Sequence, residues 1–332
     1  MNVRRLIPTA ATAGAVTLGL LALSACSSSD SAGGTSGGGS NGKLAVTASF
    51  YPMQFLAERI GGDHVSVTTL TKPGTEPHDL ELSPRETARL GQADVVLYLK
   101  GIAPAVDDAI GQSGAGRIVD AASLTTLEEH GTEAGHGHDD HAGEEGHGDE
   151  DHAEEESAGG KDPHIWLDPV KYAEVAKGVG AALEKADPDH AATYRTNTGT
   201  LVGQLGALDT AFEQGLAATT TKTFITTHAA FGYLAERYGL EQEAIAGVDP
   251  EAEPSPARVK ELGTIARQDK VSTVFFETLA SDRTAKTLAG DAGLRTDVLD
   301  PLEGITDKSK GADYLEVMEA NLAALRKALG AK

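Results

Sequence analysis

Hydrophobic and polar positions alternate along the chain with two periods from Lys43 onward, one typical of strands and one typical of helices. Short apolar runs predict strands at residues 45–50, 64–70 and 95–99, and an amphipathic stretch predicts a helix at 52–60. The tetrapeptide Ser83-Pro84-Arg85-Glu86 combines an N-cap serine with a proline at the first helical position and a glutamate at the third. It therefore predicts the start of another helix.

A second run of the same kind occupies the C-terminal part of the chain. Strands are predicted at residues 223–227, 243–246, 271–276 and 296–299, and helices at 229–238, 256–268, 282–292 and 312–329. Strands that alternate with helices in this way indicate an α/β fold with parallel sheets.

One long helix is predicted between the two runs. Beyond Pro188, apolar residues recur at steps of seven, four, three, four and four, at Tyr194, Leu201, Leu205, Leu208, Phe212 and Leu216. The sequence therefore predicts two α/β lobes, at residues 44–187 and 219–332, joined by a helix at 188–218. We expect each lobe to have a hydrophobic core of its own.

The first 25 residues have the pattern of an export signal. Arg4 and Arg5 precede an uncharged stretch that ends in Leu23-Ser24-Ala25-Cys26. A permanent anchor helix is the alternative, because the stretch is long enough to span a bilayer. The L-S-A-C sequence resembles a lipobox, which implies cleavage before Cys26 and lipid modification of that cysteine. Residues 26–43, rich in Gly and Ser, are expected to form a flexible tether.

The composition excludes some classes of protein. The chain has 28 basic and 50 acidic residues, a net charge of −22, so binding to duplex nucleic acid is not expected. The acidity suits a cationic ligand instead. A single cysteine cannot form an intramolecular disulfide, so the protein must be held together by packing.

Residues 128–160 form a low-complexity segment with 13 acidic residues and no Lys or Arg. The segment also contains six histidines, namely His130, His136, His138, His141, His147 and His152. We expect a disordered surface loop, because so polar a segment cannot bury enough apolar surface to offset its ordering entropy. The histidines favour a low-affinity zinc collector, and the alternative is a solvated acidic spacer.

Three other histidines stand beside rigid turns or at strand ends. His78 lies in Pro73-Gly74-Thr75-Glu76-Pro77-His78, His164 in Asp162-Pro163-His164-Ile165-Trp166, and His228 ends the strand at 223–227. Ligands of open α/β sheets gather outside the carboxyl ends of the strands, where His78 and His228 are expected. Together with the histidine-rich segment, this placement favours a metal site.

Four segments resemble landmarks of the metal-binding solute-binding proteins of ABC transporters, in particular the zinc-uptake branch known as ZnuA. They are PGTEPHDLELSP, DPHIWLDP, TTHAAFGYLAERYGL and LDPLEG, in the family's order, and the similarity covers residues 44–329. The resemblance implies a C-clamp of two lobes bridged by one helix, with zinc in the cleft between them. It also implies a monomeric, non-enzymatic lipoprotein outside the cytoplasm that delivers Zn²⁺ to a membrane permease and its ATPase.

The resemblance also implies a set of metal ligands. They are His78, His164, His228 and, as the fourth, Asp300 of LDPLEG, with water or a loop glutamate as the alternative there and Glu277 in reserve. A histidine at the third position favours zinc over manganese, because imidazole suits zinc and oxygen-rich sites suit manganese. The structural alternative for Asp300 is a turn or N-cap role before Pro301.

Three alternative functions remain open at this point. The first is manganese or iron binding by a member of the same family. The second is a zinc-dependent hydrolase on the same scaffold, in which Glu277 would act as general base if Asp300 did not coordinate. The third is an adhesin or sensor in which the metal is structural, so that the protein would unfold when stripped of it.

Overall fold

The computed structural model describes residues 42–130 and 161–332, in which eight strands form two parallel sheets. The first sheet contains β1 (Leu44–Ala48), β2 (Val65–Thr69), β3 (Val95–Tyr98) and β4 (Ile118–Asp120), in the order β2-β1-β3-β4. The second contains β5 (Thr223–Thr226), β6 (Glu241–Ala244), β7 (Thr273–Phe276) and β8 (Arg295–Val298), in the order β6-β5-β7-β8. The α/β prediction is confirmed, and both sheets have the same topology. We call each sheet, with the helices packed on it, the N-terminal or C-terminal lobe.

Nine α-helices and four short 3-10 helices lie in the described residues. The α-helices are α1 (Tyr51–Gly61), α2 (Pro84–Leu90), α3 (Pro104–Gln112), α4 (Pro169–Ala186), α5 (Ala191–Leu216), α6 (Gly232–Arg237), α7 (Pro256–Gln268), α8 (Arg283–Ala292) and α9 (Tyr314–Leu329). The 3-10 helices are η1 (Gly62–His64), η2 (Ala121–Leu124), η3 (Ile165–Leu167) and η4 (Pro188–His190). None of the helices in this part of the chain is both long and apolar enough to cross a bilayer.

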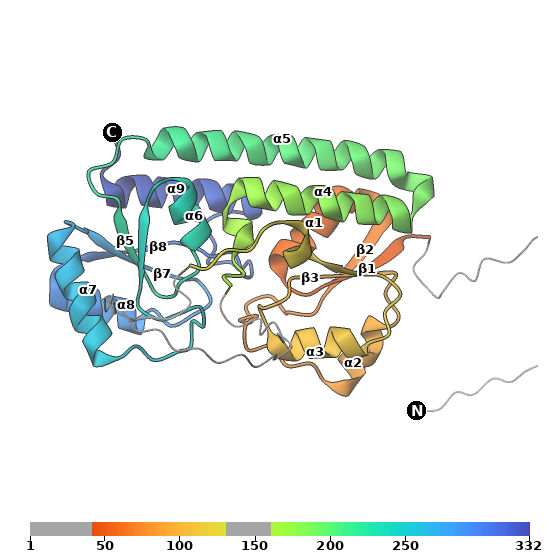
Figure 1. The fold of residues 1–332 in the computed structure, drawn as a ribbon, viewed down its shortest axis with the longest axis horizontal. Helices are drawn as coiled ribbons and strands as arrows, with labels where there is room; N and C mark the ends of the chain where they lie inside the picture. Colours follow the sequence, from red (N-terminus) through yellow and green to blue (C-terminus); the bar gives the residue numbers. More distant parts are fainter. Residues whose placement is uncertain (1–41, 131–160) are drawn as a thin grey trace, which may run out of the picture. The chain divides into compact units, whose positions relative to one another are not determined.

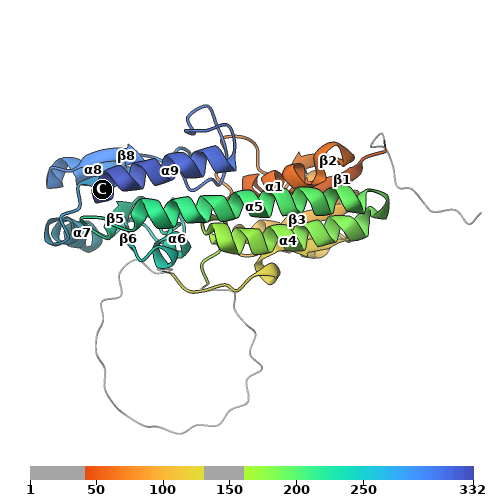
Figure 2. The same cartoon turned by 90° about the horizontal axis from the view of Figure 1, so that it is seen from above.

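The long helix α5 runs along both lobes and confirms the predicted bridge (Figure 1). Its buried residues are the six apolar residues of the predicted face. Seen from above, α4 and α9 flank it over the two lobes (Figure 2), and it contacts α1, α4 and α9. The buried face of one helix thus connects the two sheets.

Most predicted elements lie within two residues of their observed bounds. Two helix starts illustrate the agreement and the main difference. Ser83 caps α2 in a capping box with Glu86, as predicted. The helix predicted at 229–238 begins later, at Gly232, because the segment after β5 is held in a loop. In this loop the backbone amide of Ala229 donates to Gly247 O at 2.9 Å, and the hydroxyl of Thr226 donates to His228 O at 2.7 Å.

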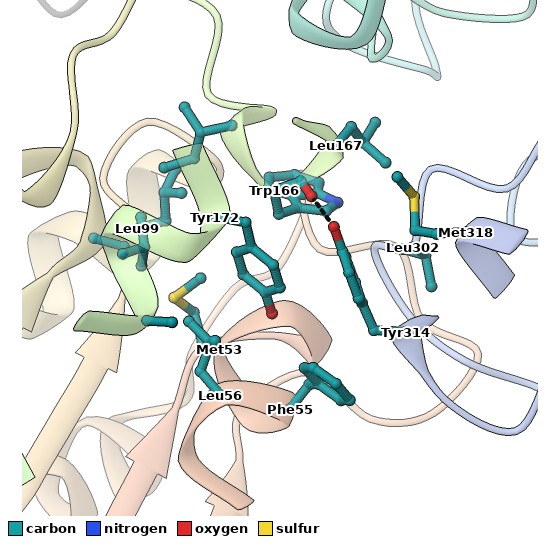
Figure 3. Packing of buried hydrophobic residues seen from close by; sticks show 14 of the residues in the cluster. Met53, Phe55, Leu56, Leu99, Trp166, Leu167, Tyr172, Leu302, Tyr314 and Met318 are labelled. Carbon is teal, nitrogen blue, oxygen red and sulfur yellow. Dashed lines mark hydrogen bonds between the residues drawn. The ribbon is translucent and has the colours of Figure 1, made fainter. Parts of the chain in front are cut away.

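The expectation of a separate core in each lobe is wrong. One large cluster of buried side chains contains Met53 and Phe55 of α1 together with Tyr314 and Met318 of α9, and only a smaller cluster is confined to the C-terminal lobe. Figure 3 shows side chains of both lobes packed around Trp166. The reason is that α5 and α9 carry apolar faces across the boundary between the sheets.

Hydrogen bonds from buried aromatic side chains reinforce this shared core. The hydroxyl of Tyr314 donates to Trp166 O at 2.6 Å (Figure 3), and the indole Nε1 of Trp166 donates to Pro301 O at 2.7 Å. The ring of Tyr314 also packs against Phe55 and Tyr172, with centroid distances of 5.3 and 4.6 Å. The segments on either side of the lobe boundary are therefore fixed relative to one another.

Candidate metal centre

Four side chains from four loops converge between the lobes. His78 follows β2 and His164 precedes η3 in the N-terminal lobe, whereas His228 follows β5 and Glu303 follows β8 in the C-terminal lobe. Their ligand atoms all lie within 4.8 Å of one another. Parallel strands bring their carboxyl ends to one edge of a sheet, which is why loops so distant in the sequence meet here.

The distances around Glu303 match a tetrahedral zinc site. Oε1 of Glu303 lies 3.2 Å from His78 Nε2, 3.3 Å from His164 Nε2 and 3.2 Å from His228 Nε2. Zinc bonds to nitrogen and oxygen of about 2.0–2.1 Å give a regular tetrahedron with edges of about 3.3 Å. The three distances that meet at Glu303 Oε1 therefore have the edge length of such a tetrahedron, and the three histidine nitrogens lie within 4.8 Å of one another.

The cluster is buried, and several of its atoms lack a hydrogen bond. The side chains of His164, His228 and Glu303 are fully buried, and that of His78 is 9% exposed. Nε2 of His164, Nε2 of His228 and Oε2 of Glu303 make no hydrogen bond in the described structure. Buried polar atoms are normally paired, so these three mark a place where a ligand is expected.

Two carboxylates behind the cluster orient two of the imidazoles. Asp162 Oδ1 lies 2.7 Å from His164 Nδ1, and Glu277 Oε1 lies 2.6 Å from His228 Nδ1. A histidine that donates from one ring nitrogen to a carboxylate keeps its other nitrogen free for a metal. Glu277, the predicted reserve ligand, is therefore placed behind His228, where it also accepts from the hydroxyl of Thr227.

The carboxylates also change the acid–base behaviour of the site. Burial lowers the pKa of His164, but Asp162 and Glu303 raise it above its usual value. Burial also lowers the pKa of His228, but Glu277 and Glu303 raise it by more, so that the pKa lies well above its usual value. Burial raises the pKa of Glu303, but the neighbouring histidines lower it well below its usual value. The carboxylate of Glu303 and the protonated imidazoles thus stabilise one another as opposite charges.

The structure brings Glu303 to the three histidines instead of the predicted Asp300. Asp300 forms the turn after β8: its Oδ1 accepts from Leu302 N at 2.9 Å, and its Oδ2 accepts from Thr278 Oγ1 at 3.1 Å. Leu302 has a φ of 60°, an unusual value for a residue with a side chain. This turn directs Glu303 toward the cluster. The turn alternative considered for Asp300 is therefore the role that the structure gives it.

Sequence reasoning missed Glu303 although it lies in the motif LDPLEG that was singled out. The residues of that motif offer two carboxylates three positions apart, and only the turn at Leu302 decides which one faces the histidines. Glu303 is completely buried although its side chain is charged. The pattern of hydrophobic residues in the sequence therefore does not predict its burial.

A further carboxylate, Glu76, lies next to the cluster. Its Oε1 accepts from His78 N at 3.0 Å, and its Oε2 is buried without a hydrogen bond in the described structure. Burial and the nearby Glu303 raise the pKa of Glu76 to about 9. The PGTEPH turn therefore contributes both His78 and a carboxyl group whose protonated form is favoured by its surroundings.

Other predicted site residues fall outside the described part of the chain. These are Cys26 and the histidines His136, His138, His141, His147 and His152. His130 is described. It lies away from the four-residue cluster, with Nδ1 3.2 Å from Asp162 Oδ2.

Comparisons with known proteins bear on the family of this chain. The family model of ZnuA, "Zinc-uptake complex component A periplasmic", matches residues 46–328. The high-affinity zinc uptake system protein ZnuA of Bacillus subtilis is 38% identical over 293 residues, which cover 86% of this chain and 88% of that protein.

A second relative is longer than this chain. The zinc-binding lipoprotein AdcA of Streptococcus pneumoniae serotype 4 is 36% identical over 301 residues, which cover 86% of this chain and 56% of AdcA. The crystal structure of Zn(II)-bound AdcA from Streptococcus pneumoniae matches with a TM-score of 0.70 and 33% identity, over 87% of this chain and 58% of that one. The chain thus spans little more than half of AdcA. A family model that matches nearly the whole of the two lobes leads to one conclusion: the chain belongs to the ZnuA family of zinc-uptake components.

Proposed function

We propose that this chain captures Zn²⁺ outside the cytoplasm and delivers it to an ABC permease in the membrane. The proposed ligands are His78, His164, His228 and Glu303. The observation that carries the proposal is the position of Glu303 Oε1, which lies 3.2–3.3 Å from the Nε2 atom of each histidine, the spacing of a zinc tetrahedron. Both relatives described above are named for zinc.

The donor set favours zinc over manganese or iron. Three imidazoles and one carboxylate form a nitrogen-rich site of the kind that zinc prefers, whereas manganese prefers oxygen ligands. Any such isolated site binds Zn²⁺ more tightly than Mn²⁺ by the Irving–Williams order, so affinity alone does not identify the cargo. Cellular uptake must be measured as well.

The arrangement favours a carrier over a hydrolase. A catalytic zinc needs three protein ligands, an open position for water and a general base nearby. Here Glu303 stands at the fourth position, and Glu277, the residue considered as a base, is held by His228 Nδ1 and the hydroxyl of Thr227. An enzymatic role is therefore not part of the proposal.

Location and partners complete the proposal. Membership in the family supports a place outside the cytoplasm and an ABC transporter as partner. We propose that residues 1–25 are a signal peptide, that Cys26 carries the lipid anchor, and that a monomer docks on a permease driven by an ATPase. We also propose that the histidines of residues 128–160 collect zinc with low affinity before it reaches the centre.

Two measurements test the proposal. First, His164→Ala and the parent are compared for zinc affinity by competition with a chelator, with His190→Ala as matched control, since His190 is also held by a carboxylate, at 2.7 Å from Asp187. Second, uptake of radioactive zinc and manganese is measured in cells that lack the native protein and carry each variant. We expect His164→Ala to lose tight binding and zinc uptake together. Unchanged affinity would reject the ligand assignment, and uptake of manganese alone would reject the cargo.

The adhesin alternative is separated by the response to chelation. A carrier whose lobes share a core stays folded when zinc is removed, whereas a structural metal site unfolds. Circular dichroism of the stripped protein distinguishes the two.

A further inference from the structure

A second group of metal-ligating side chains lies outside the zinc centre. Glu128, His130 and Glu236 each offer one ligand atom, and these atoms lie within 4.8 Å of one another. Glu128 and His130 follow η2 in the N-terminal lobe, whereas Glu236 belongs to α6 in the C-terminal lobe. The group therefore draws its members from both lobes, as the zinc centre does.

The ring of His130 lies between two carboxylates, one at each nitrogen. Its Nδ1 lies 3.2 Å from Asp162 Oδ2, and its Nε2 lies 2.8 Å from Glu236 Oε2. The other oxygen of Asp162 holds His164 Nδ1 in the zinc centre at 2.7 Å. One buried carboxylate thus orients two imidazoles, and each has its Nε2 turned toward further carboxylate oxygens. A carboxylate behind a histidine is the usual support of a protein metal ligand.

The start of α6 is shaped to seat the ring of His130. A Cβ atom on Gly232 would lie 2.2 Å from His130 Cβ and 2.9 Å from Asp162 Oδ2, closer than real contacts allow. The ring of Tyr233 meets that of His130 edge to face, with centroids 4.4 Å apart. Glycine at position 232 therefore leaves the space in which the imidazole and its carboxylate meet.

The charges and the exposure suit a divalent cation. Glu128 and Glu236 contribute two carboxylates, and besides His130 itself they have one basic partner among the described residues, Lys171, whose Nζ lies 2.5 Å from Glu128 Oε1. Lys171 also donates to Thr126 O at 2.9 Å, which anchors it beside the group. The side chain of His130 is 16% exposed and that of Glu236 is 59% exposed, so water can complete the coordination.

We infer that Glu128, His130 and Glu236 form a second, weaker zinc site at the base of the histidine-rich segment. Its three ligands are one imidazole and two carboxylates, a donor set that zinc accepts. It must be weaker than the buried centre, because the half-buried Glu128 and the exposed Glu236 lose side-chain freedom when they close on the ion. The inference deepens the proposal that the histidines of residues 128–160 collect zinc, because His130 belongs to both, but it concerns binding by these three residues and its test does not depend on transport.

The test uses the full chain with the five histidines beyond His130 in the segment, at positions 136, 138, 141, 147 and 152, replaced by Asn. This background removes the competing imidazoles. Zinc is titrated calorimetrically into the background protein and into the same protein carrying Glu236→Gln or His130→Ala. His190→Ala serves as control, because it removes a different histidine paired with a carboxylate.

We expect the background protein and the His190→Ala control to bind two zinc ions. Glu236→Gln and His130→Ala should weaken the second ion at least about tenfold, the smallest effect typical of losing even an outer-shell partner of a metal ligand. Retention of the first, tight ion shows in the same titration that each variant is folded. A background protein that binds a single ion, or a second ion whose affinity both variants leave unchanged, would overturn the inference. Since Glu236 is mostly exposed, Glu236→Gln decides the matter even if His130→Ala unfolds.

Discussion

At the residue scale, the turn after β8 gives different positions to two carboxylates that lie three residues apart in the sequence, Asp300 and Glu303. Glu303→Gln should weaken zinc binding by at least about tenfold, because it removes the negative charge that lies within 3.3 Å of three imidazoles. Asp300→Asn keeps the shape of the turn and an oxygen that can accept from Leu302 N, so its effect should be smaller. Chelator competition measures both, and a greater loss for Asp300→Asn would return the ligand role to Asp300.

The protonation of two of these histidines predicts how binding depends on pH. The pKa values of His164 and His228 are raised in the metal-free protein, chiefly by Asp162, Glu277 and Glu303 acting against burial. Zinc must displace these protons, so affinity should fall as pH decreases, and the fall should begin above the ordinary histidine pKa of about 6.5. Two displaced protons correspond to a loss of up to about a hundredfold per pH unit.

The stability of the metal-free protein should depend on pH in the opposite sense to its zinc affinity: it should decrease as pH rises. A raised folded-state pKa stabilises the protein fully below the unfolded value of about 6.5, and this contribution is lost as pH rises through the raised pKa. The increase in melting temperature caused by zinc should therefore grow between pH 6 and pH 8. Calorimetric scans with and without zinc measure it, and an increase that stays constant would contradict the assigned protonation.

At the scale of elements, one hydroxyl of α9 donates a hydrogen bond to the other lobe in addition to the packing of the shared core. Tyr314→Phe removes the donor to Trp166 O and leaves that buried carbonyl unpaired, which should cost about 1–3 kcal/mol of unfolding free energy. Tyr98→Phe is the matched control, because the half-buried hydroxyl of Tyr98 makes no hydrogen bond within the described residues. Urea denaturation compares the two, and equal stabilities would mean that the bond does not hold α9.

The same scale shows what local patterns can predict. The capping box at Ser83, the bounds of α7 and the buried face of α5 follow from short-range sequence rules, and all three appear as expected. The start of β6 differs from the prediction. The strand begins at Glu241, two residues before the predicted start, because Glu241 pairs with Thr223 of β5. Pairing between strands and the turn at Leu302 depend on distant or unusual backbone geometry, which hydrophobic periodicity does not encode.

At the scale of the whole molecule, the shared core predicts cooperative unfolding. Since the larger cluster contains side chains of α1, α4, α5 and α9, neither lobe can lose its part of this cluster without disrupting the other lobe. Heating should therefore produce one transition with equal calorimetric and van't Hoff enthalpies. Two resolved transitions would show that the lobes unfold independently.

The position of the only tryptophan has an optical consequence. Trp166 is fully buried, and its ring centroid lies 5.1 Å from that of His164. Its indole N–H is bonded to Pro301, in the same loop as Glu303. A cation that reaches His164 and Glu303 changes the electric field on both sides of this chromophore. The emission of the unlabelled protein, excited at the indole band, should therefore respond to filling of the buried centre and respond less to an ion at Glu236, which reaches the indole only through Asp162 and His164, so that loading can be followed in real time without a dye.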